Sequence, residues 1–178
     1  MLKSIEEYDR KSVSTNKDWC TPAVYADAIR KFFGIIELDP CSNKYSLVKA
    51  QTEFNLLVNG LAQEWNYKTI FVNPPYGRNK ENNTSLKDWI LRCQDSHKKY
   101  GSEVILLVPA STNTKHWQNI IFQSATAICF LKEPRVKFFN PEYDLSKGAP
   151  MACSIVYWGK EVERFIQEFG IFGKVLKV

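Results

Sequence analysis

The chain has 178 residues, which is the length of one domain and enough to bury a core beside a cleft. With 44% hydrophobic and 24% charged residues, no apolar run near the roughly 20 residues of a membrane span and a polar start, it is expected to be a globular protein without membrane attachment. Five scattered cysteines predict no disulfide framework and no metal site, and they favour a reducing, cytoplasmic setting. A net charge of +5 weakly favours a polyanionic partner.

The first 18 residues show no periodicity and are expected to form a mobile arm, followed by a single domain over residues 19–178. Thr21 is expected to cap a first helix, with Pro22 at its first position. The helix is predicted to end at Gly34. Its apolar residues recur at helical spacing: Val24, Tyr25, Ala28, Ile29 and Phe32.

Further along the chain, apolar runs alternate with helical patterns. The runs predict strands at 35–38, 51–54, 69–72, 104–108, 127–131 and 152–158. A short helix is expected at 44–50, and polar or irregular segments at 77–85 and 133–150. Three longer helices are predicted from their apolar faces: Leu86, Trp89, Ile90 and Cys93; Trp117, Ile120 and Ile121; and Val162, Phe165, Ile166 and Phe169.

This alternation predicts an α/β fold in which helices cover both faces of a mostly parallel sheet. Sheets of this kind bind their ligands at the carboxyl ends of the strands. Asp39 and Asn73 each follow a predicted strand end, so we expect them to lie at the ligand-binding edge.

The tetrapeptide Asn73-Pro74-Pro75-Tyr76 carries the chemistry. Two prolines stiffen the loop and remove two N–H donors, while Asn73 is pushed towards an extended conformation. The side-chain oxygen of Asn73 and the carbonyl of Pro74 can each accept one hydrogen of a planar amino group. Such bonds expose the nitrogen lone pair to a methyl donor, while Tyr76 can stack on the ring. The motif is equally consistent with a rigid turn without chemistry, but its position directly after a strand favours methylation of an exocyclic amino nitrogen.

Taken together, several motifs in order resemble the phage-type DNA N6-adenine methyltransferase (Dam) family over about residues 19–158. Besides the NPPY tetrapeptide and the residues around it, the resemblance is carried by Trp19-Cys20-Thr21-Pro22, Leu38-Asp39-Pro40-Cys41, Asn59-Gly60-Leu61 with Trp65, Lys87-Asp88-Trp89, Val108-Pro109-Ala110 and Arg135-Val136-Lys137-Phe138. The resemblance implies a Rossmann-like class I fold that uses S-adenosylmethionine to methylate adenine N6 in double-stranded DNA, with the target base flipped out.

The resemblance also implies a set of cofactor contacts. Thr21 and Pro22, beside Trp19, would touch the methionine part of S-adenosylmethionine. Asp39, Pro40 and Cys41 would line the cofactor loop, which lacks the usual glycines. Two more residues complete the set: Glu53, a candidate for the ribose hydroxyls, and Asn59, which stands where the family usually has Asp.

Basic residues beside the expected base pocket are candidates for phosphate contacts. Arg78 and Lys80 follow the NPPY motif, and Arg135 and Lys137 precede the irregular segment. As plain surface charges they would need no function. Phe138 or Phe139 is equally suited to be a second wall of the base pocket and to be a core residue.

Two other functions remain open at this point. A protein glutamine N5-methyltransferase also uses NPPY, although such enzymes usually carry a glycine-rich loop and a recognition domain. A catalytically inactive nucleic-acid-binding module would bind DNA but not the cofactor. N4-cytosine enzymes usually have Ser in place of Asn73, so cytosine is the less favoured base.

Overall fold

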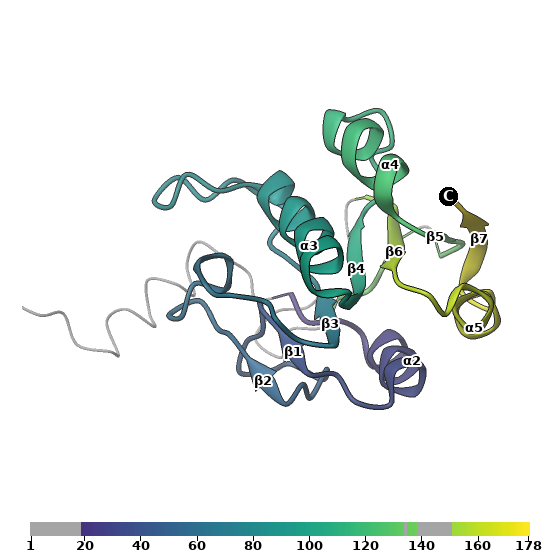
Figure 1. Ribbon diagram of the computed structural model, residues 1–178, viewed down its shortest axis with the longest axis horizontal. Coiled ribbons are helices and arrows are strands. Elements are labelled where there is room, and N and C mark those ends of the chain that lie inside the picture. Colours follow the sequence, from purple (N-terminus) through teal and green to yellow (C-terminus); the bar gives the residue numbers. More distant parts are fainter. Residues whose placement is uncertain (1–18, 134, 139–150) are drawn as a thin grey trace, which may run out of the picture.

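The computed structural model describes residues 19–133, 135–138 and 151–178 (Figure 1). The arm expected at residues 1–18, Phe139 and most of the irregular segment expected at 133–150 lie outside the described residues. In the described ranges, no helix is long and apolar enough to cross a membrane.

A seven-stranded mixed sheet forms the centre of the structure, in the order β2-β1-β3-β4-β6-β5-β7 (Figure 1). Neighbours from β2 to β4 pair in parallel, whereas β6 is antiparallel to both β4 and β5, and β7 is antiparallel to β5. β1 to β5 therefore run in one direction. The strands are β1 (Leu38–Asp39), β2 (Thr52–Glu53), β3 (Thr69–Val72), β4 (Glu103–Pro109), β5 (Ala127–Leu131), β6 (Cys153–Trp158) and β7 (Gly173–Lys177).

The helices pack against two clusters of buried side chains, and successive residues of β4 alternate between these clusters. One cluster contains Ile105 and Leu107 with residues of α2 and α5, and the other contains Val104, Leu106 and Val108 with residues of α3 and η2. Each large apolar side chain buried in this way contributes about 1.5–3 kcal/mol. The helical elements are α2 (Ala23–Phe33), η1 (Gly60–Ala62), α3 (Leu86–Tyr100), η2 (Trp117–Ile121), α4 (Phe122–Ser124) and α5 (Val162–Phe169).

Helix α3 follows the NPPY loop and the polar segment after it, and both of its ends are well defined. Asp88 accepts hydrogen bonds from the backbone N–H and hydroxyl of Ser85, at 2.7 and 2.9 Å, and this capping box fixes where the helix begins. The helix ends at Gly101, whose φ of 71° suits a residue without a Cβ. The buried face predicted from Trp89, Ile90 and Cys93 is confirmed.

Several local predictions were wrong. The hydroxyl of Thr21 does not cap α2, because it accepts a hydrogen bond from Asn73 instead, and Pro22 precedes the helix. Val24 is exposed. No helix forms at 44–50, where Asn43 Oδ1 and Ser46 Oγ accept bonds from backbone N–H groups two residues ahead and stabilise turns.

The first and last strands also differ from the prediction. A strand was predicted at 35–38, but β1 begins at Leu38 and includes Asp39. Ile35, at the start of the predicted strand, is exposed. Strand β7 was not predicted. None of its residues is buried, so its sequence has no pattern of buried positions, and the strand is defined by its pairing with β5.

Candidate functional site

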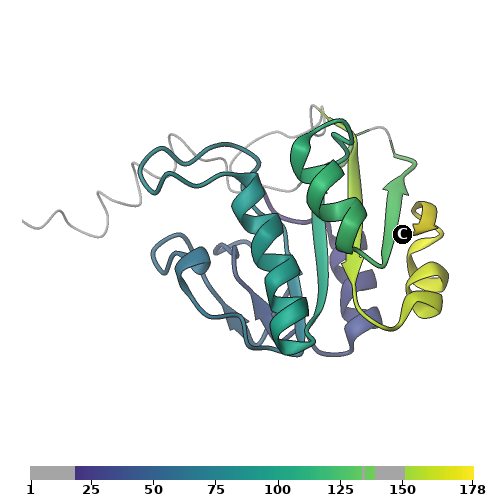
Figure 2. The ribbon, with the colours of Figure 1, turned by 45° about the horizontal axis from the view of Figure 1, so that its top comes forward.

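The sequence motifs come together at the carboxyl edge of the parallel strands (Figure 2). Asp39 ends β1, Asn73 follows β3 and Pro109 ends β4, and these strands are neighbours in the sheet. Cys153 pairs with Pro109, so antiparallel β6 begins at the same edge. The edge therefore collects side chains from four consecutive strands of the sheet.

The side chain of Asn73 is held in one orientation by two residues that lie more than 50 positions earlier in the chain. Its Nδ2 donates to the Trp19 carbonyl and to the Thr21 hydroxyl, each at 3.2 Å. Because a carbonyl can only accept, these bonds determine which end of the amide is the NH2 group. Oδ1 consequently faces the other way, where the Tyr76 hydroxyl lies at 3.3 Å.

The ring of Tyr76 is half-buried and forms one side of this arrangement. It meets Phe138 edge to face at 6.0 Å, and Phe138 meets Trp19 in the same way at 5.9 Å. Phe138 itself is buried, so it supports Tyr76 from within the core. Burial, together with the nearby Cys153 and Cys41 thiols, raises the pKa of Tyr76 well above its usual value, and its hydroxyl is therefore a neutral donor.

The two prolines of the motif have different surroundings. Pro74 is buried and Pro75 is exposed. The loop therefore has a buried inner side and an exposed outer side.

The neighbouring loop after β1 carries a buried carboxyl. Asp39 is only 4% exposed, and its Oδ1 accepts a bond from the Cys41 backbone N–H at 3.1 Å. Burial raises the pKa of Asp39 from 3.8 to about 7, and Glu53, its partner across the β1–β2 pairing, adds a smaller upward contribution. Burial likewise raises the pKa of the Cys41 thiol. The Glu53 side chain is exposed and accepts a bond from the Ala50 N–H.

Close packing brings Asn59 to this same loop. A Cβ on the next residue, Gly60, would lie 1.8 Å from the Pro40 carbonyl oxygen, so only glycine allows the two backbones to approach. The Gly60 carbonyl accepts a bond from the buried Trp65 indole at 2.8 Å, while Asn59 adopts a left-handed φ of 51°. Two motifs that lie 20 residues apart in the sequence thus form one wall.

The predicted cofactor residues therefore fall into two adjoining groups. Trp19 and Thr21 contact Asn73, whereas Asp39, Pro40, Cys41, Glu53 and Asn59 surround the ends of β1 and β2. The carbonyl of Pro22 is used by the start of α2, where it accepts from the N–H groups of Tyr25 and Ala26.

The polar segment after Tyr76 is a small hairpin, which we call the hairpin 77–85. Asn79 and Thr84 pair through two backbone hydrogen bonds of 2.8 and 3.1 Å. Arg78 and Lys80 are both exposed on it, and Arg78 donates to the Asn83 side chain at 2.7 Å. The hairpin extends from the carboxyl edge of the sheet (Figure 2).

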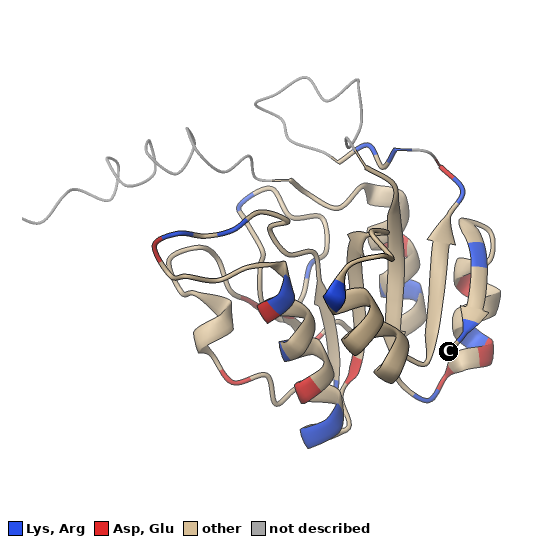
Figure 3. Ribbon diagram, turned by 90° about the horizontal axis from the view of Figure 1, so that it is seen from above, with Lys and Arg blue, Asp and Glu red and all other residues tan. Residues whose placement is uncertain are grey.

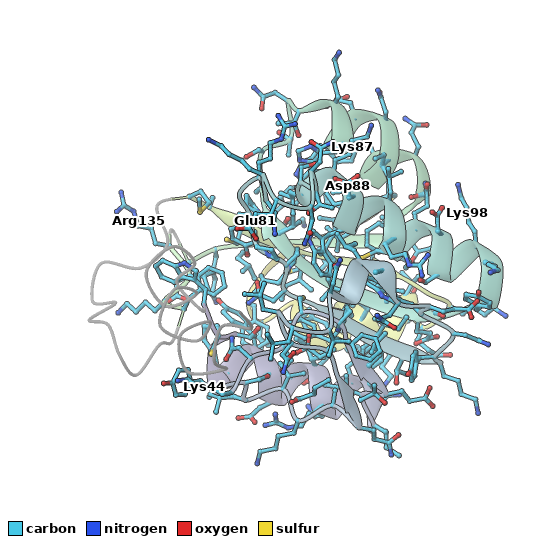
Figure 4. All side chains as sticks on the ribbon, turned by 90° about the vertical axis from the view of Figure 1, so that its left-hand side faces the viewer. Lys44, Glu81, Lys87, Asp88, Lys98 and Arg135 are labelled. Carbon is cyan, nitrogen blue, oxygen red and sulfur yellow. The ribbon has the colours of Figure 1, made fainter. Side chains whose placement is uncertain are left out.

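The second basic segment follows β5. Exposed and buried residues alternate along it: Arg135 and Lys137 are exposed, and Val136 and Phe138 are buried. The alternation anchors the segment and turns its charges outward, and Arg135 extends away from the body of the protein (Figure 4). Lys and Arg also occur elsewhere on the surface (Figure 3), so these two segments are distinguished by their position beside Tyr76 and not by charge density.

Two features of the site were not predicted from the sequence. The bonds of Trp19 and Thr21 to Asn73 join distant segments, and no local pattern signals them. The other feature is Ser42, which follows Cys41; it is buried, and its hydroxyl has no hydrogen-bond partner. Within the described residues, no group of three or more His, Cys, Asp or Glu side chains could hold a metal ion.

Comparison with known proteins identifies the family of the chain. No curated protein sequence matches the chain. A model of the DNA N-6-adenine-methyltransferase (Dam) family matches residues 10–177, nearly the whole chain. The chain therefore belongs to the DNA N-6-adenine-methyltransferase (Dam) family, which implies methylation of adenine in DNA with S-adenosylmethionine as the methyl donor.

Proposed function

We propose that this protein transfers a methyl group to the exocyclic N6 of adenine in double-stranded DNA, with the target base flipped out of the helix. One observation carries the proposal: the amide of Asn73 is oriented by Trp19 and Thr21 so that its oxygen faces the Tyr76 side. Family membership supports adenine as the base. We further propose a single domain over residues 19–178 with a Rossmann-like class I fold and helices on both faces, which the alternation of β4 between two core clusters supports.

In the proposed reaction, Asn73 Oδ1 and the Pro74 carbonyl accept the two hydrogens of the adenine amino group. The amino nitrogen then directs its lone pair away from the purine ring, and Tyr76 holds the ring by stacking. S-adenosylmethionine supplies an electrophilic methyl group bonded to a sulfonium. The Tyr76 hydroxyl and the adenine amino group can both donate to Asn73 Oδ1, because an amide oxygen has two lone pairs.

The residues at the ends of β1 and β2 fit an adenosyl cofactor. Asp39 and Glu53 lie side by side in the strand pairing and offer carboxylate acceptors for hydroxyl groups. The unpartnered hydroxyl of Ser42 lies in the same loop. We propose that Asp39, Pro40, Cys41, Glu53 and Asn59 hold the adenosyl part, while Trp19, Thr21 and Pro22 border the methionine part beside Asn73.

We propose that DNA is held mainly through its phosphates. Arg78 and Lys80 are exposed on the hairpin 77–85, which follows Tyr76 in the chain. Arg135 and Lys137 are exposed on the segment of Phe138, whose ring contacts Tyr76. Phosphate contacts position a duplex without reading its sequence. Phe138 acts indirectly in this proposal, by supporting the ring of Tyr76 on which the flipped base stacks.

The decisive experiment incubates the protein with tritiated S-adenosylmethionine and DNA, RNA or protein in parallel. Label in DNA, recovered as N6-methyladenine after nuclease digestion and mass spectrometry, is the expected result. Label recovered as N4-methylcytosine would move the target to cytosine, and label in glutamine would show a protein methyltransferase. DNA binding without cofactor binding, measured by calorimetry, would identify an inactive binding module.

A further inference from the structure

Ser42 differs from the other buried polar residues of the described ranges. These residues are Thr21, Asp39, Ser42, Ser96, Ser102 and Ser154. Thr21 accepts a bond from Asn73, Asp39 accepts one from Cys41, and the three other serines each donate to a backbone carbonyl. The hydroxyl of Ser42 has no partner, although the side chain is only 8% exposed. Leaving a buried hydroxyl unsatisfied opposes folding, so this serine calls for a functional explanation.

A second buried polar atom without a partner, Nε of Arg92, has a structural explanation. Another nitrogen of the same guanidinium donates to the Gln63 carbonyl, and the group lies over the Trp65 ring at 5.7 Å. Arg92 is therefore held by the fold, with one of its several donors unused. Ser42 has a single hydroxyl, and nothing in the fold uses it.

The position of Ser42 points to the proposed cofactor site. Its backbone N–H donates to the Phe54 carbonyl at 2.9 Å, and the Phe54 N–H donates to the Asp39 carbonyl at the same distance. Ser42 is thereby held between the end of β1 and the end of β2. Its chain neighbours Cys41 and Asn43 are partly exposed, so the loop lies at the surface on both sides of Ser42. No hydrogen bond of its own restrains the hydroxyl, and contact with a ligand requires its rotation about Cα–Cβ.

We infer that Ser42 binds a ribose hydroxyl of the adenosyl cofactor, an inference that rests on the proposed function. A serine hydroxyl both donates and accepts, as a ribose hydroxyl does. The carboxyl groups of Asp39 and Glu53 flank the same strand ends. They repel a carboxylate when ionised, so the methionine carboxylate is disfavoured here, and a neutral sugar that can donate to them is favoured.

The test compares Ser42→Ala with Ser46→Ala, a matched change in the same loop. Ser46 Oγ accepts the Val48 N–H at 3.2 Å, so its loss removes a structural bond. Binding is measured by calorimetry with two probes, S-adenosylhomocysteine and 5′-methylthioadenosine, which share the adenosyl part and differ in the amino acid. Melting temperatures without ligand are measured in parallel.

Ser42→Ala should raise the dissociation constants of both probes by a similar factor of about 2–10, the value of one hydrogen bond. Without ligand it should melt at or above the wild-type temperature, since no bond is lost. Ser46→Ala should melt lower and bind both probes as the wild type does. If Ser42→Ala weakens only S-adenosylhomocysteine, or weakens neither probe, the inference is overturned. Failure of the wild type to bind either probe would instead overturn the proposed function.

Discussion

The loop Asn73–Tyr76 and the hairpin 77–85 adjoin in the sequence but are stabilised in different ways. Asn73 is bonded to Trp19 and Thr21, and Tyr76 packs against Phe138, so distant segments hold the loop. The hairpin, in contrast, is held by bonds among its own residues, such as those between Asn79 and Thr84. Its basic side chains are exposed, whereas Pro74 is buried.

Under the proposed function, this difference separates the two requirements of a DNA-modifying enzyme. Methyl transfer needs groups fixed in advance, because misplacement of a reacting group by about 1 Å can cost on the order of 100-fold in rate. Phosphate binding needs charge and tolerates a segment that adjusts to the duplex. Changes in the loop should therefore alter the rate of the reaction, and changes in the hairpin should alter affinity.

The largest effect is expected from Asn73→Ala. It removes the acceptor for the amino group, and we expect the rate of methyl transfer at saturating DNA to fall by roughly two to three orders of magnitude. The dissociation constants of cofactor and DNA, measured by calorimetry, should change little. A rate within a few fold of wild type would remove Asn73 from the reaction and with it the contrast between the two regions.

The buried edge of the sheet should also respond to pH. The pKa of Asp39 is about 7 in the folded protein against 3.8 ordinarily, so between these values the folded state binds more protons than the unfolded chain. Its contribution to stability is greatest below about pH 4 and is lost as the pH rises to about 7. Asp39→Asn should reduce the fall in unfolding free energy between pH 4.5 and 8 by a few kcal/mol in urea titrations. An unchanged pH profile would show that Asp39 is ionised throughout.

For the hairpin we expect an effect on affinity alone. Replacing Arg78 and Lys80 together by Ala should lower the slope of log affinity for DNA against log salt by about two units, one for each phosphate contact. The control, Lys98→Ala with Lys160→Ala, makes the same charge change on exposed residues near the opposite edge and should leave the slope unaltered. A change in which sites are methylated, with the slope unaffected, would mean that the hairpin reads bases.

The smallest effect is expected from Thr21→Val, which removes one of the two acceptors that orient Asn73. The bond from Asn73 to the Trp19 carbonyl remains, so kcat at saturating cofactor should fall only about 2–10-fold. Thr21→Ser keeps the hydroxyl and should restore most of the rate. A loss confined to KM for the cofactor, with kcat intact, would show that Thr21 acts in binding and not in positioning Asn73.

Local patterns in the sequence predict much of the fold, because strands and amphipathic helices depend on short-range features. The strand at 69–72, the NPPY tetrapeptide after it and the buried face of α3 are marked by short-range signals, and the structure contains this strand and this face. Contacts over long distances in the chain have no such signal. A threonine before proline is a common helix cap, yet the Thr21 hydroxyl bonds to Asn73, 52 residues later.

The short helix expected at 44–50 fails for a related reason. Asn43 and Ser46 can bond to nearby backbone N–H groups, and these bonds compete with helix formation. Strand β7 depends on its pairing with β5, which a single segment does not reveal. The unpartnered hydroxyl of Ser42 becomes visible only once its surroundings are known.

The self-contained hairpin has a consequence for how this protein can diversify. Its two arms pair at Asn79 and Thr84, and helix α3 begins directly afterwards at the capping box of Ser85 and Asp88. A longer tip between these arms is expected to leave the sheet and α3 unchanged, because each doubling of loop length costs only about 0.6 kcal/mol in closure entropy. We therefore expect the tip to be a position where segments can be inserted or exchanged without change to the rest of the fold.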